Sequence, residues 1–200
     1  MEKKYPVITI SRAYAAYGRT IAAALSKELG LPYYDKDFVH ETAARSGYSE
    51  EDIEREGEDM SRSSQLMNSF LNNAVRYASS YDGIFKAQRE VVLQLAKEPC
   101  IIVGRCADHI LREEGVDSFN IYLYADLEHR IARAAEIEQD PNADIKKIAV
   151  KKDTQRRIYY KQYTGKEMGD TENYDVSLNV GKIGVENCVK ILCELIRAQQ

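Results

Sequence analysis

Short apolar segments that alternate with helical segments constrain the fold of this chain more than any other feature. Five segments rich in aliphatic, β-branched or aromatic residues have the length of single strands: 5–10, 31–34, 100–104, 119–125 and 174–180. Helical patterns occupy the ranges 18–29, 37–44, 84–97, 107–112, 127–138, 144–163 and 185–198. This alternation predicts βαβ units, and therefore an α/β fold with a parallel sheet and helices on both faces.

The composition indicates an ordinary globular chain. Its 200 residues include 28 Lys+Arg and 32 Asp+Glu, which gives a formal charge of −4. A core of this size can stand alone, so we expect one domain over residues 1–200. No apolar run reaches the roughly 18 residues of a membrane span, so we expect no membrane partner. The slightly acidic balance argues against a nucleic-acid partner.

The four cysteines do not form a metal-binding pattern. Cys100, Cys106, Cys188 and Cys193 include no C-x-x-C pair, and the chain has only three histidines. Three of the cysteines, Cys100, Cys188 and Cys193, stand among aliphatic residues, which predicts buried thiols. Without an export signal, we expect a reducing, cytoplasmic location.

The segment Ser11–Thr20 is the first candidate for ligand binding, because ligands of parallel α/β sheets bind at the carboxyl ends of the strands. It precedes a helix, whose free N–H groups attract anions. Arg19 can take the place of the P-loop lysine, and Thr20 can offer its hydroxyl to Mg²⁺. Of the glycines in that motif only Gly18 is present. A plain connection between strand and helix is the alternative.

Two further strand ends carry charged residues. Gly104 allows the chain to turn, and Arg105 then projects at the strand end, where it can bind a phosphate. The alternative is a surface arginine paired with Asp108. Asp35 ends the second strand, and its carboxylate can accept a hydrogen bond from a hydroxyl or base amine of an acceptor substrate. It can equally cap the following helix.

A basic helical stretch follows Pro141. Asp153 and Arg156 lie three residues apart and therefore share a helix face. Such a stretch can close over nucleotide phosphates and supply arginines to a transferring phosphoryl group. A solvated helix face and a nucleic-acid patch are the alternatives. Its cationic residues are Lys146, Lys147, Lys151, Lys152, Arg156, Arg157, Lys161 and Lys166.

Tyrosines and glycines end this basic stretch. Gly165 and Gly169 bracket a charged segment, as expected of a lid that hinges. For most of the tyrosines at 159, 160 and 163 we expect packing at the base of that segment rather than a chemical role.

Taken together, several segments resemble the cytidylate kinase-like family, which is similar to cytidylate kinases within the P-loop nucleoside monophosphate kinases. The segments are ITISRAY (8–14), PYYDK (32–36), VGRCAD (103–108), YYKQYTGK (159–166) and NYDVSLN (173–179). The Gly-Arg and Tyr-Thr-Gly-Lys segments are the most specific, and the resemblance extends from Ile8 to the last helix.

The resemblance implies a three-layer P-loop kinase fold. Its parts are a five-stranded parallel sheet flanked by helices, a helical acceptor-binding insertion at about 37–83 and a lid at about 141–172. It also implies ATP and Mg²⁺ as cofactors and nucleotides as substrates. The implied site residues are Gly18, Arg19 and Thr20 for ATP, Thr20 for the metal, Asp35, Arg105 and Asp108 for the acceptor, and Arg19, Arg156, Arg157 and Asp153 for catalysis, with Asp153 orienting the two lid arginines.

One segment departs from the family pattern. Family members carry a glycine-rich stretch before the arginine, whereas this chain has Tyr14-Ala15-Ala16-Tyr17-Gly18-Arg19, and Met168 stands where the lid is expected to hold tryptophan. We therefore keep two functional hypotheses: an active kinase for a nucleoside monophosphate or related small acceptor, and a catalytically impaired nucleotide-binding protein. A nucleic-acid binder is a weaker third, and the 60–98 segment offers a surface for a homodimer.

Overall fold

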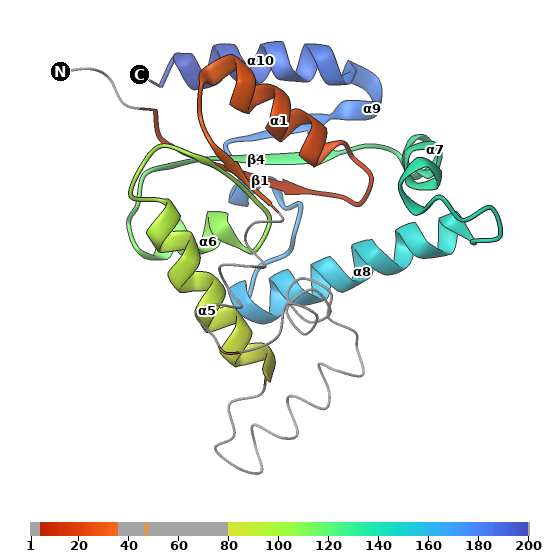
Figure 1. Cartoon of the computed structure of the whole chain (residues 1–200), viewed down its shortest axis with the longest axis horizontal. Helices are drawn as coiled ribbons and strands as arrows, with labels where there is room; N and C mark the ends of the chain where they lie inside the picture. The colour runs from red at the N-terminus through yellow and green to blue at the C-terminus, as the bar shows by residue number, and fades with distance from the viewer. Residues whose placement is uncertain (1–4, 36–46, 48–79, 200) are drawn as a thin grey trace.

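The computed structural model describes residues 5–35, 47 and 80–199 of the chain. Within these residues the structure confirms the α/β architecture (Figure 1). The elements are β1 (Val7–Arg12), α1 (Gly18–Leu29), β2 (Tyr33–Tyr34), α5 (Ser80–Leu95), β3 (Ile101–Val103), α6 (Ala107–Glu113), β4 (Ser118–Tyr124), α7 (Leu127–Glu138), α8 (Ile145–Thr164), η1 (Thr171–Asn173), β5 (Val176–Asn179), α9 (Val180–Ile183) and α10 (Val185–Arg197).

The five strands form one parallel sheet in the order β2-β3-β1-β4-β5. β1 therefore lies at the centre, and its neighbours β3 and β4 come from distant parts of the chain. In a parallel sheet all carboxyl ends lie at one edge, so the turns after β1, β2 and β3 meet there. This topology brings three of the predicted segments together.

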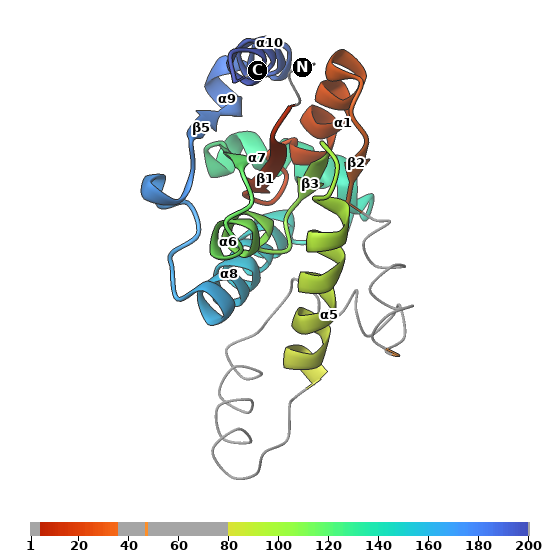
Figure 2. The same ribbon diagram turned by 90° about the vertical axis from the view of Figure 1, so that its left-hand side faces the viewer.

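Helices cover both faces of the sheet, and each face has its own core (Figure 2). Side chains alternate along a strand, so Ile101 and Val103 pack towards α1 and α10, while Ile102 packs towards α5 and α6. α7 lies beyond the carboxyl end of β4, whereas α8 runs along the other side of the sheet from α1 and α10, the side that also carries α5 and α6 (Figure 1). The predicted lid range of about 141–172 contains α8 and most of η1.

Several predicted element ends are corrected. β1 continues through Ser11 and Arg12, because these residues pair with Tyr122 and Leu123 of β4. β2 is shorter than predicted, because the Leu31 N–H is used to cap α1, donating to Ser26 O at 3.2 Å. β5 ends at Asn179, where the asparagine side chain caps α9.

The predictions for the cysteines and for the acceptor-binding insertion have different outcomes. All four cysteines are buried free thiols, as predicted for three of them. The helix expected at 37–44 and most of the acceptor-binding insertion lie outside the described residues, as does part of the 60–98 segment proposed for a homodimer. Among residues 5–35 and 80–199, no helix combines the length and apolar composition that crossing a bilayer requires.

Candidate active site

The loop between β1 and α1, Ala13–Tyr17, turns sharply. Ala15 and Tyr17 both have φ of 59°, in the left-handed region that favours glycine. Gly18 follows, and a Cβ atom there would lie 2.9 Å from Cγ of Arg12. Gly18 is therefore needed because a side chain there would collide with Arg12. The positive φ angles of the loop, by contrast, belong to Ala15 and Tyr17.

A largely buried ion pair between two helices holds this loop in place. Asp153 of α8 accepts a hydrogen bond from the backbone N–H of Tyr14 at 2.7 Å and pairs with Arg130 of α7 at 2.8 Å. Arg130 also donates to the carbonyl oxygens of Tyr14, at 2.9 Å, and of Ala125, at 2.8 Å. The loop is thus fixed from outside, by residues more than one hundred positions away in the chain.

A cavity of about 450 Å³ opens above the loop. Its walls come from the loop, the start of α1, the ends of β2 and β3, and the helices α7 and α8. The charged residues that line it are Arg12, Arg19, Arg105, Arg133, Lys152 and Arg156, with the two carboxylates Asp35 and Glu138. Four positive charges are therefore in excess, and such a cleft attracts an anion of high charge.

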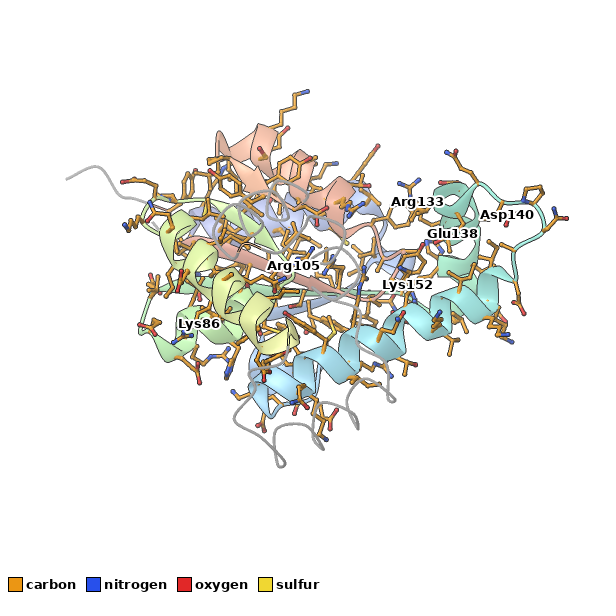
Figure 3. All side chains as sticks on the ribbon, turned by 60° about the horizontal axis from the view of Figure 1, so that its bottom comes forward. Lys86, Arg105, Arg133, Glu138, Asp140 and Lys152 are labelled. Atoms are coloured by element: carbon orange, nitrogen blue, oxygen red, sulfur yellow. The ribbon has the colours of Figure 1, made fainter. Side chains whose placement is uncertain are left out.

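The labelled side chains in Figure 3 show how separate elements contribute to this cavity. Arg105 comes from the end of β3, Arg133 and Glu138 come from α7, and Lys152 comes from α8. Lys86 of α5 lies apart from them. The positive charge is therefore assembled by the fold and not by one basic segment.

The predicted ATP-binding residues meet the predicted acceptor residue Asp35 here. Gly18, Arg19, Thr20 and Asp35 all line the cavity. Arg19 forms an ion pair with the buried carboxylate of Asp35, and Nη2 of Arg12 lies 4.0 Å from the same carboxylate. Asp35 thus balances two cations that face the cavity.

The two loop tyrosines lie against the neighbouring helices. Tyr14 is buried and its hydroxyl donates to Glu138, so burial and this hydrogen bond raise the pKa of Tyr14. The guanidinium of Arg156 lies 5.5 Å from the centre of the Tyr14 ring, within cation–π range. The Tyr17 ring faces α7, where Arg133 lies 5.3 Å from its centre. The Tyr17 ring therefore forms one wall and leaves the cavity open.

The turn after β3 carries a second unusual backbone. Gly104, Arg105 and Cys106 have φ of 79°, 62° and 54°, three left-handed residues in succession. Arg105 follows this turn and lines the cavity, and its Nη1 atom is buried behind the cavity surface with no hydrogen-bond partner among the described residues. A buried guanidinium N–H without an acceptor is costly, so this atom is suited to a ligand oxygen.

Asp108 is near this turn but does not line the cavity. It is 1% exposed, and its Oδ2 accepts a hydrogen bond from the Tyr160 hydroxyl at 2.6 Å. Burial raises the pKa of Asp108, against the opposite effects of the Tyr160 hydrogen bond and Arg112. The contact that the structure gives Asp108 is thus with α8, and the surface pairing of Arg105 with Asp108 is not what holds Arg105.

α8 presents its cationic residues unequally. Lys152 and Arg156 line the cavity, whereas Arg157 is exposed and is not among the lining residues. Consecutive helical residues point about 100° apart, which separates the two arginines. Asp153 lies behind the loop, with its two oxygens towards Tyr14 and Arg130.

The tyrosines at the end of α8 pack as predicted. Tyr159 donates a buried hydrogen bond to Gln88 of α5 at 2.6 Å. Phe85 of α5 stacks on Tyr163 with ring centres 4.0 Å apart. These contacts fix the carboxyl-terminal half of α8 against α5.

The sequence interpretation missed several residues of this site. Arg12, Arg133 and Glu138 line the cavity, and Arg130 holds the loop. Arg12 ends a buried strand next to the predicted loop, which was a usable signal. The residues of α7 offered no such signal, because nothing in their spacing shows which strand end α7 approaches. In the described part of the chain no group of three or more metal-ligating side chains gathers.

The sequence pattern of the cytidylate kinase-like family matches residues 7–182. This chain belongs to the cytidylate kinase-like family. The match contains both left-handed turns, the ion pair and all the cavity residues described above. No curated protein sequence matches the chain.

Solved structures confirm the P-loop kinase fold. An uncharacterized protein from Eubacterium ventriosum superposes with a TM-score of 0.71 at 21% identity, covering 96% of this chain and 99% of its own. Shikimate kinase from Bacteroides thetaiotaomicron gives 0.57 at 13% identity, over 97% and 99% of the two chains. The YorR protein from Bacillus subtilis, in complex with phosphorylated GDP, gives 0.53 at 14%, over 96% of each. At these identities the likeness defines the fold and leaves the acceptor open.

Proposed function

We propose that this protein is a kinase that transfers the γ-phosphoryl group of ATP to a nucleoside monophosphate of the cytidylate class. Membership of the cytidylate kinase-like family supports this class of reaction. The observation that carries the proposal is the cavity at the carboxyl ends of β1, β2 and β3, with four positive charges in excess. Phosphoryl transfer needs this kind of site, because its catalysis is mostly positioning and charge stabilisation.

In this proposal the loop after β1 and the start of α1 bind the ATP phosphates. Gly18 and Thr20 stand at the N-terminus of α1, where N–H groups and the helix dipole favour an anion. Arg19 supplies a cation when a phosphate replaces Asp35 as its partner. Alanine at position 15 does not prevent the turn, because the loop already has the positive φ angles.

The donor set also fits Mg²⁺ bound together with the nucleotide. Mg²⁺ keeps several waters and takes few protein ligands when substrate phosphates complete its shell. Thr20, which lines the cavity, would supply its hydroxyl. Mg²⁺ held there would supply positive charge that neutralises the phosphates.

Arg105 and Asp35 bind the acceptor. Arg105 lines the cavity, and its buried Nη1, which has no partner among the described residues, can donate to the acceptor phosphate after a small shift of the side chain. Asp35 can accept from an acceptor hydroxyl or amine. Asp108 contributes through its contact with Tyr160 by holding the turn that presents Arg105.

Arg156 acts on the transferring group. The Tyr14 ring orients its guanidinium towards the cavity. As an oxygen of the acceptor phosphate attacks the γ-phosphorus and the bond to ADP breaks, Arg156 and Lys152 stabilise the charge that develops on the phosphoryl oxygens. Arg157 keeps the role of a second lid arginine only if α8 rotates or shifts when substrates bind.

A coupled assay tests this function. The purified chain is mixed with ATP, Mg²⁺ and, in turn, CMP, dCMP, UMP, AMP, GMP and small alcohols such as shikimate, and ADP release is followed. We expect turnover with CMP above that with the other acceptors. A chain that turns over a non-nucleotide acceptor is still a kinase, but the nucleoside monophosphate assignment is then wrong.

A catalytically impaired nucleotide-binding protein is the second candidate. Two features favour it: alanine and tyrosine occupy the left-handed positions of the loop, and Asp35 already neutralises Arg19. In that case ATP or CMP raises the melting temperature without turnover of any acceptor. Turnover with one acceptor excludes this candidate.

The remaining partner predictions have direct tests. A homodimer predicts twice the monomer mass in sedimentation equilibrium. The absence of nucleic-acid binding predicts no salt-dependent shift of labelled DNA or RNA. Fractionation of the native cell tests the cytoplasmic location.

A further inference from the structure

The pair formed by Arg130 and Asp153 lies outside the cavity but touches the loop that forms its floor. The two side chains are only 10% and 14% exposed, and Nη1 of Arg130 lies 2.8 Å from Oδ2 of Asp153. One charge comes from α7 and the other from α8. A buried ion pair often stabilises a protein no better than apolar residues of the same size, so its presence calls for another explanation.

Both main-chain polar groups of Tyr14 are bound by this pair. The N–H of Tyr14 donates to Oδ1 of Asp153 at 2.7 Å, and its carbonyl oxygen accepts from Arg130 at 2.9 Å. Rotation of the Tyr14 backbone would break both bonds. The next residue, Ala15, has a left-handed backbone, a strained conformation that persists only where the surroundings impose it.

The same two helices carry cations and a carboxylate of the cavity. Lys152 and Arg156 lie one residue before and three residues after Asp153 on α8, and Arg133 and Glu138 follow Arg130 on α7. Glu138 adds a further link, because it accepts from the Tyr14 hydroxyl. The positions of these charges relative to the loop N–H groups therefore depend on how the loop is fastened to α7 and α8.

We propose that Arg130 and Asp153 are positioning residues that lock the phosphate-binding loop and the helices α7 and α8 into one unit. This inference rests on the proposed function in one respect, namely that the cavity binds the ATP phosphates. The lock sets the spacing between the loop amides and the α8 cations before ATP arrives. The family resemblance implies that Asp153 orients the lid arginines. In this proposal Asp153 instead holds the phosphate-binding loop.

The residue types suit this task. Arg130 makes three hydrogen bonds in a fixed geometry, to Ala125, Tyr14 and Asp153. Lysine has a single ammonium group and cannot reproduce the planar fork. Asparagine at 153 would offer one oxygen instead of two, so either Tyr14 or Arg130 would lose its acceptor.

The decisive variant replaces both charges at once, Arg130→Met with Asp153→Leu. Apolar residues of similar shape remove the lock without leaving an unpaired buried charge, so we expect the variant to fold, with a melting temperature lowered by the main-chain groups of Tyr14 and Ala125 that lose their partners. Arg130→Lys keeps the charge and serves as a second variant if the double variant does not fold. The control is Glu114→Gln, which removes the charge that pairs with Arg89, two residues that do not line the cavity.

Two kinetic results are expected of the double variant with ATP and CMP as substrates. Misplacement of the α8 cations should lower kcat by about a hundredfold, and the Kd of ATP should rise by about tenfold or more. The KM of CMP should change less than about threefold, because Arg105 and Asp35 lie in the turns after β3 and β2, which the lock does not touch. A folded double variant with wild-type kcat and ATP affinity overturns the proposal.

Hydrogen exchange without nucleotide separates this inference from the proposed function. Peptides that span residues 12–20 should exchange about tenfold faster in the double variant than in the wild type, and not in Glu114→Gln. If the wild type neither binds ATP nor phosphorylates CMP, the proposed function is wrong, and this exchange result still decides whether the lock exists. Unchanged exchange in residues 12–20 means that Arg130 and Asp153 do not hold the loop.

Discussion

Two turns that lead from a strand into a helix meet at this cavity, and they are held differently. The turn after β1 has left-handed backbones at Ala15 and Tyr17, and the turn after β3 has them at Arg105 and Cys106. In the first turn the backbone polar groups of Tyr14 are bound by α7 and α8. In the second turn, Nη1 of Arg105 finds no partner among the described residues.

This difference separates the roles of the two turns. A left-handed non-glycine residue costs about 1–2 kcal/mol, so each turn needs support from its surroundings. The turn after β1 receives it from a buried ion pair and is complete before a ligand binds. The turn after β3 is set by the sheet, where the Gly104 N–H donates to the Ile10 carbonyl at 3.0 Å, and it leaves Nη1 of Arg105 without a partner among the described residues. This difference supports the proposed division, with ATP at the first turn and the acceptor at the second.

The largest expected effect comes from Arg156→Ala, on the side of the turn after β1. Loss of one charge that stabilises the transferring group should lower kcat by about a hundredfold to a thousandfold. Steady-state kinetics with ATP and CMP measure this, together with a melting curve to show that the variant folds. Lys190→Ala, which removes an exposed cation on α10, is the control. Wild-type kcat in Arg156→Ala would remove Arg156 from the mechanism.

Arg105→Ala tests the turn after β3. The lost charge-assisted hydrogen bond, worth about 1.5–3 kcal/mol, should raise the KM of CMP by about tenfold to a hundredfold. The KM of ATP should stay within about threefold of the wild type, because the loop after β1 is untouched. Equal effects on both substrates would mean that the two turns do not divide the substrates as proposed.

Arg105→Gly sharpens this result, since it removes the same guanidinium but suits a φ of 62°. The two variants should share one KM for CMP, while glycine gives the higher free energy of unfolding, by about 1 kcal/mol. Urea titration of both variants measures the difference, which isolates the backbone strain of this turn.

The sequence allowed the fold and the place of the site to be predicted, because both depend on local patterns. Apolar strands alternate with helices, and chemistry in parallel sheets lies at the strand ends. Gly18, Arg19, Thr20, Asp35 and Arg105 were found this way, and all of them line the cavity.

The far wall of the cavity was harder to predict, because it depends on packing between distant helices. Tyr14 and Asp153 are separated by 139 positions, and no local pattern links them. α8 is charged on most sides, so its spacing does not reveal that Arg156 faces the cavity and Arg157 faces solvent. Side-chain partners across helices needed the structure.

Asp108→Asn tests the buried carboxyl next to the second turn through pH. Burial raises the pKa of Asp108 in the folded state above the value of about 3.9 for an unfolded aspartate. The folded protein therefore binds this proton more tightly, and the wild type loses stability as the pH rises from that unfolded value through the folded pKa.

Asparagine at position 108 cannot ionise, so the variant does not lose stability for this reason as the pH rises. The stability of Asp108→Asn relative to the wild type should therefore increase as the pH rises from 4 to 8, measured by urea unfolding at each pH. Asp117→Asn, which removes an exposed carboxyl, is the control and measures the effect of losing a carboxylate that is not buried. A difference that does not change with pH would show that Asp108 is not a costly buried charge in the folded protein.

Ala15→Gly is expected to have the smallest effect, and it tests whether the turn after β1 is complete without a ligand. If the loop has the same left-handed backbone in the free and bound protein, the strain at φ 59° is present in both states and cancels from the binding free energy. The Kd of ATP, measured by calorimetry, should then change less than about threefold. A tenfold gain in affinity would show that the free loop relaxes and that ATP must restore its shape. Repeating Ala15→Gly in the Arg130→Met, Asp153→Leu background should produce that gain, because a loop released from α7 and α8 must return to the left-handed backbone when ATP binds.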